Sequence, residues 1–250
     1  MNRSPADQGE WIELPVTNVL TLAAVAAAGT RYPWLDFRDS LAERVWRSLG
    51  ADASHISDIE LRAALARTLE IDKLVRRWAL GREGGWVVEL GSGLSTRHAR
   101  LLECTRPLAS VDVPRLASVR RDVFPESSGF VQVSAPLEER GWIRALVATR
   151  GAPFVVVEDA FLDSDGREVL AILCALAAEL PRGSLIAASH GPRARFVVAD
   201  ATARRASLGV RVVLAGGRAQ IARFPRLAWV LPPSPLDGTE LAAVALLEVL

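Results

Sequence analysis

The sequence predicts a single α/β domain built on a mostly parallel β-sheet with helices on both faces. Three observations lead to this prediction. Short apolar runs rich in β-branched residues alternate with amphipathic segments from about residue 86 to residue 190, which is the pattern of β-α units in a parallel sheet. One run, Trp86–Leu90, continues into Gly91-Ser92-Gly93 and then into a helical pattern. Acidic residues follow several of the runs, at the edge where parallel strands end together.

Length and composition fit one globular domain. The chain has 250 residues, of which 50% are hydrophobic and 24% are charged, so one sizeable core is expected. The formal net charge of +1 gives no overall attraction to nucleic acid or membranes. The apolar segment Val19–Ala28 is too short to span a bilayer and is a poor match to a signal peptide. We expect a cytoplasmic protein, and the near absence of lysine indicates a GC-rich bacterial coding sequence.

The two cysteines, Cys104 and Cys174, lie within apolar helical patterns. Two free, buried thiols are a better interpretation than a disulfide, which agrees with a cytoplasmic location. Two cysteines do not make a metal site, and no metal is expected.

Three helices are predicted before the first strand, over Thr17–Ala28, Asp39–Leu49 and Ile59–Leu80. Gly29 is expected to end the first and Gly81 the third. A minimal doubly wound domain does not require this extension, which commonly covers a ligand. Residues 1–81 are therefore interpreted as a helical cap and residues 82–250 as the core, in one compact unit.

The elements after the glycine turn are predicted in order along the chain. Strands are expected within Pro107–Pro114, ending at Asp112, and at Phe130–Val133, Pro153–Val157 and Leu185–Ser189. Helices are expected over His98–Glu103, Leu116–Val123, Leu137–Ala148 and Gly166–Leu180.

After residue 190 the pattern is less regular. A helix is expected over Arg193–Leu208, followed by an antiparallel closing pair at Val210–Leu214 and Gln220–Phe224. Leu227–Leu231 is compatible with a further strand, and a last helix is expected over Thr239–Val249 after a run of prolines.

The segment Glu89-Leu-Gly-Ser-Gly93 indicates a cofactor site. Glycines at a strand-to-helix turn let a ligand lie against bare backbone at the edge of the sheet. The segment is not a dinucleotide-binding motif, because Thr96 stands where the third glycine would be. Glu89 would repel a phosphate and attract a cation, so S-adenosylmethionine fits this turn better than a dinucleotide. The alternative is an ordinary glycine turn of an α/β domain.

Acidic residues mark the carboxyl ends of three predicted strands: Glu89, Asp112, and the pair Glu158-Asp159. Asp112 follows Gly93 at about the 20-residue spacing at which an acid reaches ribose hydroxyls. Each residue alone is compatible with a solvated carboxylate. Their order behind one glycine turn predicts a single crevice for a cofactor.

With these motifs in this order, the chain resembles the leucine carboxyl methyltransferase / polyketide O-methyltransferase family, a branch of the class I S-adenosylmethionine-dependent methyltransferases. The resemblance covers about residues 17 to 190. It is carried by Arg67–Asp72, Val87–Arg97 and Val111–Pro114, and to a lesser degree by Val157-Glu158, Pro181–Ser184 and Leu41–Val45. It implies a Rossmann-like methyltransferase fold with an antiparallel closing strand and a helical N-terminal cap.

The resemblance also implies a cofactor-binding set. Arg67 would bind the methionine carboxylate, Asp112 the ribose hydroxyls, and Glu158 would lie near the methionine ammonium. Leu137 would pack on the adenine. The full set is Arg67, Glu89, Gly91, Ser92, Gly93, Asp112, Val113, Leu137 and Glu158. The alternative for Arg67 is a surface ion pair with Glu70 or Glu60.

The chain departs from the family pattern at two places. After the third strand the family usually has Asp-Leu, whereas this chain has Ser134-Ala-Pro-Leu137. The family tyrosine after the fourth strand falls near Asp163, and Tyr32 is the only tyrosine in the chain. The first departure weakens recognition of the adenine amino group, and the second removes a group on the substrate side.

The implied activity is methyl transfer from S-adenosylmethionine to an oxygen of a small molecule, a carboxylate or a phenol, in secondary-metabolite biosynthesis of the polyketide type. A carboxylate needs no general base, whereas a phenol needs one, and His190 after the fifth strand is the candidate. A monomer or homodimer is expected. The alternative is a non-methylating homologue that acts as a cyclase-like or scaffold partner in a biosynthetic complex. Nucleic-acid methylation and hydride transfer are disfavoured.

Overall fold

The computed structural model of the chain describes residues 16–51, 53–80, 84–101, 107–124, 129–158, 160, 166–190, 227–235 and 243–249. Its strands form one seven-stranded sheet in the order β3-β2-β1-β4-β5-β7-β6. The strands are β1 (Val87–Leu90), β2 (Leu108–Asp112), β3 (Phe130–Ser134), β4 (Phe154–Val157), β5 (Leu185–His190), β6 (Leu227–Pro235) and β7 (Ala243–Val249).

Strands β1 to β5 are parallel, which confirms the predicted parallel sheet. β1 lies at its centre, between β2 and β4. From β1 the chain first builds outward through β2 and β3, then returns to the other side of β1 with β4 and β5. The carboxyl ends of β1 and β4 therefore flank the point where the strand order reverses, which is where open α/β sheets bind ligands.

The helices of the described residues are α1 (Val16–Arg31), α2 (Ser40–Leu49), α3 (Asp58–Ala79), α4 (Arg97–Arg100), α5 (Pro114–Val123), α6 (Arg140–Arg150) and α8 (Gly166–Glu179), with a 3₁₀ turn η3 (Pro33–Leu35). The three helices predicted before the first strand are confirmed. Asp39 caps α2 by accepting a hydrogen bond from the Ala42 amide, and Ser57 and Glu60 form a capping box at the start of α3.

The prediction that Gly29 ends the first helix is wrong, because α1 continues to Arg31. The reason lies in the residue that follows the helix. Tyr32 is 3% exposed, and its amide donates to the Ala28 carbonyl at 2.8 Å, which keeps the last turn helical. The glycine-turn helix is shorter than expected: α4 ends at Arg100, and residues 102–106 lie outside the described part.

The last helix, predicted over Thr239–Val249, is also wrong, because residues 243–249 form strand β7. Leu246 belongs to the hydrophobic cluster on the α3 side of the sheet, whereas Val249 belongs to the cluster on the opposite face. Residues three apart point to opposite faces of a strand, but they share a face of a helix. Burial on both sides therefore overrides the helical propensity of this Ala- and Leu-rich run.

Of the other elements predicted after residue 190, only one lies within the described residues. The helix over 193–208 and the closing pair at 210–214 and 220–224 lie outside the described residues. The segment predicted as compatible with a strand is β6, which extends to Pro235. It pairs antiparallel with β7, and β7 pairs antiparallel with β5.

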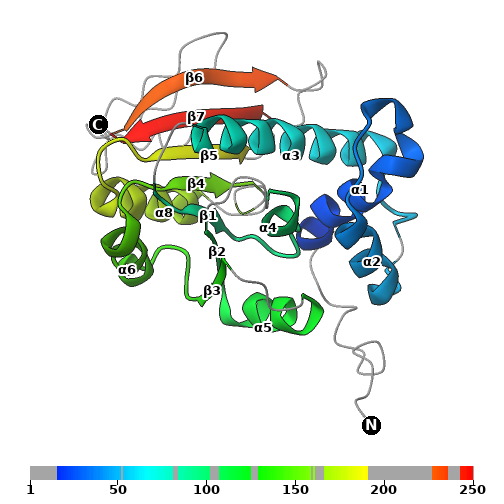
Figure 1. Cartoon of the computed structure of the whole chain (residues 1–250), viewed down its shortest axis with the longest axis horizontal. Helices are drawn as coiled ribbons and strands as arrows, with labels where there is room; N and C mark the ends of the chain where they lie inside the picture. The colour runs from blue at the N-terminus through cyan, green and yellow to red at the C-terminus, as the bar shows by residue number, and fades with distance from the viewer. Residues whose placement is uncertain are drawn as a thin grey trace.

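The sheet is covered by α6 and α8 on one face and by the second half of α3 on the other. The sequence of β4 is entirely apolar because the strand is buried on both faces. Val155 and Val157 pack toward α6 and α8, while Phe154 and Val156 pack toward α3. The first half of α3 packs instead with α1 and α2. Figure 1 shows α1 and α2 gathered at one end of α3, on the side to which the arrows of β4 and β5 point.

Two further expectations concern single features. Cys174 in α8 is a free thiol, as predicted, although it is half-buried and not buried. Cys104 lies outside the described part. None of the described helices combines the length and hydropathy needed to cross a bilayer.

The backbone of Gly91 gives a test of this fold. Its φ is +59°, and an added Cβ would lie 2.6 Å from the Cβ of Ala160. Gly50 has a similar φ of +57°, but nothing lies within 4 Å of its added Cβ. Gly50→Ala should cost about 1–2 kcal/mol of unfolding free energy for the left-handed backbone alone, and Gly91→Ala about 1–3 kcal/mol more for the clash.

Urea unfolding followed by far-ultraviolet circular dichroism measures both values. Equal losses for the two variants would contradict the close approach of Ala160 to the glycine turn.

Candidate functional site

The glycine turn follows β1 directly and is held by backbone bonds to neighbouring elements. The Gly91 amide donates to the Val111 carbonyl of β2 at 2.8 Å, and the Ser95 amide closes the turn onto the Ser92 carbonyl at 2.9 Å. Gly91 and Gly93 both have positive φ, at +59° and +48°, a conformation that favours glycine. The sequence places glycine where this turn requires it.

Asp112, at the end of β2, is bonded to this turn. Its Oδ2 accepts hydrogen bonds from the Ser92 hydroxyl at 2.7 Å and from the Gly93 amide at 3.0 Å. The side chain is buried, and burial raises its pKa to about 6, although the Ser92 hydrogen bond and the charge of Arg120 act in the opposite direction. A carboxyl with this pKa changes its charge close to neutral pH.

Three carboxylates converge on one buried guanidinium beside the turn. Arg97, the first residue of α4, donates from Nε to Asp72 Oδ1 and from Nη2 to Glu158 Oε2, both at 2.6 Å, and from Nη1 to Glu89 Oε1. The Arg97 side chain is fully enclosed. Burial acts to lower the pKa of Arg97, but the carboxylates of Glu158, Asp72 and Glu89 outweigh it and raise that pKa well above its usual value.

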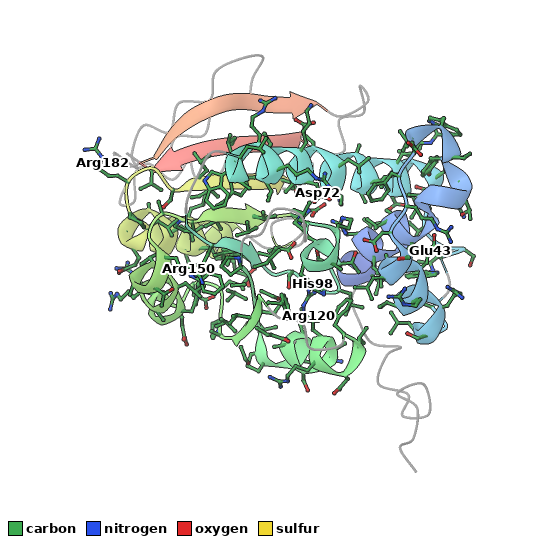
Figure 2. All side chains as sticks on the ribbon, viewed as in Figure 1. Glu43, Asp72, His98, Arg120, Arg150 and Arg182 are labelled. Carbon is green, nitrogen blue, oxygen red and sulfur yellow. The ribbon has the colours of Figure 1, made fainter. Side chains whose placement is uncertain are left out.

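A second arginine, one turn further along α4, extends the network to the N-terminal helices. Arg100 donates to Asp72 Oδ2 at 2.8 Å and to Asp39 Oδ2 at 3.1 Å. Thr96 also donates to Asp39 Oδ2, at 2.6 Å. Because Asp39 is the cap of α2 and Asp72 belongs to α3, the network joins these helices to the turn. In Figure 2, Asp72 lies in the interior beside α4, whereas Glu43 and Arg182 lie at the periphery.

A small pocket opens where these groups meet the glycine turn. It is lined by Thr21, Glu89, Leu90, Gly91, Ser92, Ser95, Val156 and Glu158. Both oxygens of Glu158 have partners, because Oε2 accepts from Arg97 and Oε1 from Thr68. Glu89 differs: Oε1 accepts from Ser95 at 2.9 Å and from Arg97, but buried Oε2 has no partner among the described residues. Among the described residues, therefore, one residue that lines the pocket has a buried carboxylate oxygen without a donor.

The structure gathers most of the predicted site residues at this edge. Glu89, Gly91, Ser92 and Glu158 line the pocket. Gly93 and Asp112 adjoin it through the bonds of the turn. The Cδ1 atom of Leu137 lies 3.4 Å from the position of an added Cβ on Gly91, and Val113 is 41% exposed immediately after Asp112.

Neither Arg67 nor His190 is among the described residues that line the pocket. Arg67 is only 3% exposed, so it does not lie on the surface, where the alternative interpretation placed it. Its neighbour Thr68 donates to the pocket residue Glu158. His190 is the last residue of β5 and pairs with Ala243 of β7, and its side chain lies outside the described part. Its role as a base stays a prediction.

The sequence reasoning assigned no role to Arg97, Asp72, Arg100 or Asp39, which carry the buried network. Arg97 and Asp72 stood inside the segments that carried the family resemblance, and Arg97 and Arg100 are three residues apart, on one face of a helix. These signals identify a shared face of α4. They do not reveal that acids from α3, from β1, from the N-cap of α2 and from the residue after β4 meet there.

Comparisons with known proteins agree with this geometry. No protein-family model matches the chain. The chain is 26% identical over 171 residues to the tetracenomycin polyketide synthesis O-methyltransferase TcmP of Streptomyces glaucescens, and the match covers 65% of this chain and 63% of the relative. The chain therefore spans less than two thirds of the length of this relative.

Two solved structures share the fold. A DUF574 family protein from Streptomyces avermitilis matches with a TM-score of 0.54 at 14% identity, over 94% of this chain and 97% of that one. The magnesium protoporphyrin IX methyltransferase of Synechocystis PCC 6803, solved with bound S-adenosylmethionine, matches with a TM-score of 0.51 at 11% identity, over 92% and 97% of the two chains.

Removing the central cation tests the network. Arg97→Met leaves three buried carboxylates without their shared partner, so it should lower the unfolding free energy by about 3–5 kcal/mol at pH 7.5. The loss should be smaller at pH 5, because protonation of the abandoned carboxylates removes the buried charge. The matched control is Arg144→Met, since Arg144 pairs with Glu179 at 2.7 Å on the surface.

The control should change stability little, because exposed ion pairs contribute little. Chemical unfolding at the two pH values measures both variants. An Arg97→Met variant as stable as the control would show that the three carboxylates do not depend on Arg97.

Proposed function

We propose that this chain, which has the fold of the class I S-adenosylmethionine-dependent methyltransferases and is distantly homologous to TcmP, transfers a methyl group from S-adenosylmethionine to an oxygen of a small molecule. The observation that carries the proposal concerns Glu89, which lines the pocket beside the glycine turn: its Oε2 is buried and has no partner among the described residues. A buried carboxylate oxygen without a donor costs about 1–3 kcal/mol or more. A cationic donor from a ligand would satisfy it.

The methionine half of the cofactor suits the charges of the pocket. Its ammonium group would donate to Glu89 Oε2, with Thr21 of α1 and Glu158 on the same lining. We assign the methionine carboxylate to Arg67, which is buried on α3 next to the turn of helix that holds Glu158 through Thr68. Arg97 occupies one oxygen of each glutamate, and Thr68 occupies the second oxygen of Glu158. Because only Glu89 keeps an unpartnered oxygen among the described residues, it is the stronger ligand for the ammonium.

The adenosine half suits the edge formed by β2 and the residues after β3. Asp112 would accept hydrogen bonds from the ribose hydroxyls, while Gly91, Ser92 and Gly93 provide the close backbone approach. Val113, which is 41% exposed, and Leu137 offer apolar contacts for the adenine ring.

The cofactor supplies a methyl group on a positively charged sulfur, and the protein contributes mainly by positioning the donor and the acceptor. A carboxylate acceptor is already a nucleophile, whereas a phenol would pass its proton to a base, for which His190 is the candidate. The name of TcmP, a polyketide synthesis O-methyltransferase, supports an oxygen acceptor and a polyketide-type substrate in bacterial secondary metabolism.

One observation favours a second candidate, a non-methylating homologue that acts as a cyclase-like or scaffold partner. The segment Ser134–Leu137, which should face the adenine, contains a hydroxyl but no carboxylate. Methyl turnover by the purified protein would exclude this candidate.

Incubation with methyl-labelled S-adenosylmethionine and a panel of aromatic polyketide carboxylates and phenols tests the proposal. Label should move to an acceptor oxygen, and alkaline treatment should then release it from a methyl ester but not from a methyl ether. Tight binding of the cofactor with no transfer to any member of the panel would favour the non-methylating candidate.

Glu89→Gln should distinguish the contribution of the amino-acid half of the cofactor to binding from that of the adenosine half. The amide keeps an oxygen for Ser95 and Arg97 but removes the charge facing the ammonium, so the affinity for S-adenosylhomocysteine should fall about 10-fold or more, roughly 1.4 kcal/mol. The affinity for methylthioadenosine, which lacks the amino-acid half, should change less than about two-fold.

Calorimetry with both ligands measures the effect, with the exposed Glu138→Gln as the control variant. Equal losses for the two ligands would place the ammonium elsewhere.

The pKa of Asp112 predicts the pH dependence of binding. If ionised Asp112 accepts from the ribose, affinity for S-adenosylhomocysteine should be highest above pH 6 and fall by up to about ten-fold per pH unit below it. In the ligand-free protein the sign is opposite: because folding raises the pKa to about 6, ionisation of Asp112 costs stability as pH rises through that value.

Asp112→Asn should therefore bind the ligand weakly at every pH while unfolding at a higher temperature than the native protein above pH 6. Calorimetric titrations and thermal melts between pH 5 and pH 8 measure both effects. An unchanged affinity of the variant would defeat the assignment of Asp112.

A further inference from the structure

Arg120 of α5 is a second fully buried guanidinium, and none of the described carboxylates is in contact with it. Its Nη1 donates to the Gly93 carbonyl at 2.8 Å and its Nη2 to the Ser95 carbonyl at 2.7 Å. It forms no ion pair with any described carboxylate, and its Nε has no partner among the described residues. Burying a charged group costs folding free energy unless the group is paired and hydrogen-bonded.

Aromatic rings enclose the guanidinium from the other side. Its carbon lies 4.6 Å from the ring centre of Phe124 and 5.1 Å from that of Phe130. His98 Nδ1 lies 3.1 Å from Nη2, and Figure 2 shows the two side chains next to each other near α4. Burial lowers the pKa of His98 to about 4 and that of Arg120 to about 10. At neutral pH, therefore, a neutral histidine accepts from a charged arginine.

Gly93 is held between this cation and the carboxylate of the site. Its amide donates to Asp112 Oδ2 at 3.0 Å, and its carbonyl accepts from Arg120 at 2.8 Å. The residue has a φ of +48°. One glycine of the turn is thus fixed at its amide by an anion and at its carbonyl by a cation.

We propose that Arg120 is a positioning residue for the cofactor: its two donors fix the carbonyls of Gly93 and Ser95, and its charge balances Asp112 across the turn. This inference rests on the proposed function, since it assigns a role in shaping the same site. The charged groups that act on Asp112 are Arg120 from α5, which favours its ionised form, and Glu89 from β1, which disfavours it.

The two roles of Arg120 can be separated by substitution. Lysine keeps the positive charge but lacks the planar fork that reaches two carbonyls at once. Methionine keeps neither the charge nor the donors. Arg121, the next residue on α5, is exposed and gives a matched control.

The experiment is a calorimetric titration with S-adenosylhomocysteine from pH 5.0 to pH 8.5 for the native protein, Arg120→Lys, Arg120→Met and Arg121→Met. The native affinity should reach half of its plateau near pH 6. Arg120→Lys should keep this midpoint, with a plateau about 10-fold weaker. Arg120→Met should lose at least as much at the plateau and shift the midpoint upward by about one pH unit or more. Arg121→Met should match the native protein.

Folded Arg120→Lys and Arg120→Met variants with the native plateau and midpoint would overturn the inference. If Arg120→Met does not fold, Arg120→Lys alone decides: a native plateau overturns the inference, and a weaker plateau at an unchanged midpoint supports it. Failure of the proposed function is recognised separately, because the native protein itself would then not bind S-adenosylhomocysteine at any pH.

Carbon-13 NMR of the labelled aspartate carboxyls in ligand-free protein reports the shift of the Asp112 midpoint without any ligand.

Discussion

The enclosed guanidinium of Arg97 binds carboxylates from α3, from β1 and from the residue that follows β4, and the arrangement of the site depends on this contact. Three acids could not share a dry interior without a cation, because each would cost several kcal/mol of lost hydration. With Arg97 between them, Glu89 and Glu158 are both held at the carboxyl edge of the sheet. The helix that bears Arg97 begins directly after the glycine turn, so the ion pairs also fix where that turn ends.

The same contact determines which carboxylate oxygens can still accept a hydrogen bond from a ligand. Arg97 takes one oxygen from Glu89 and one from Glu158, and Thr68 takes the other oxygen of Glu158. Among the described residues, Oε2 of Glu89 is then the one buried carboxylate oxygen without a partner. A site whose buried acids are largely neutralised, with one acceptor left over, suits a ligand that brings one ammonium group and not a dication or a phosphate.

Periodicity and turn chemistry in the sequence predicted the three leading helices and the glycine turn, because these features are local. The alternation of strand and helix patterns predicted the parallel sheet. The position of Asp112 at the edge of the sheet was predictable too, because its distance in sequence from the glycines corresponds to the length of one helix and the following strand. The role of Arg97 was not, because its three partners come from elements as far apart in sequence as Asp72 and Glu158. Strand β7 was missed for a related reason: an apolar run buried on both faces has no period that separates strand from helix.

The most direct test of the central claim is a calorimetric titration of the native protein with S-adenosylmethionine and with S-adenosylhomocysteine at pH 7.5. We expect both ligands to bind at one site per chain with micromolar affinity. If neither ligand binds, the assignment of the glycine turn and Glu89 as a cofactor site is contradicted.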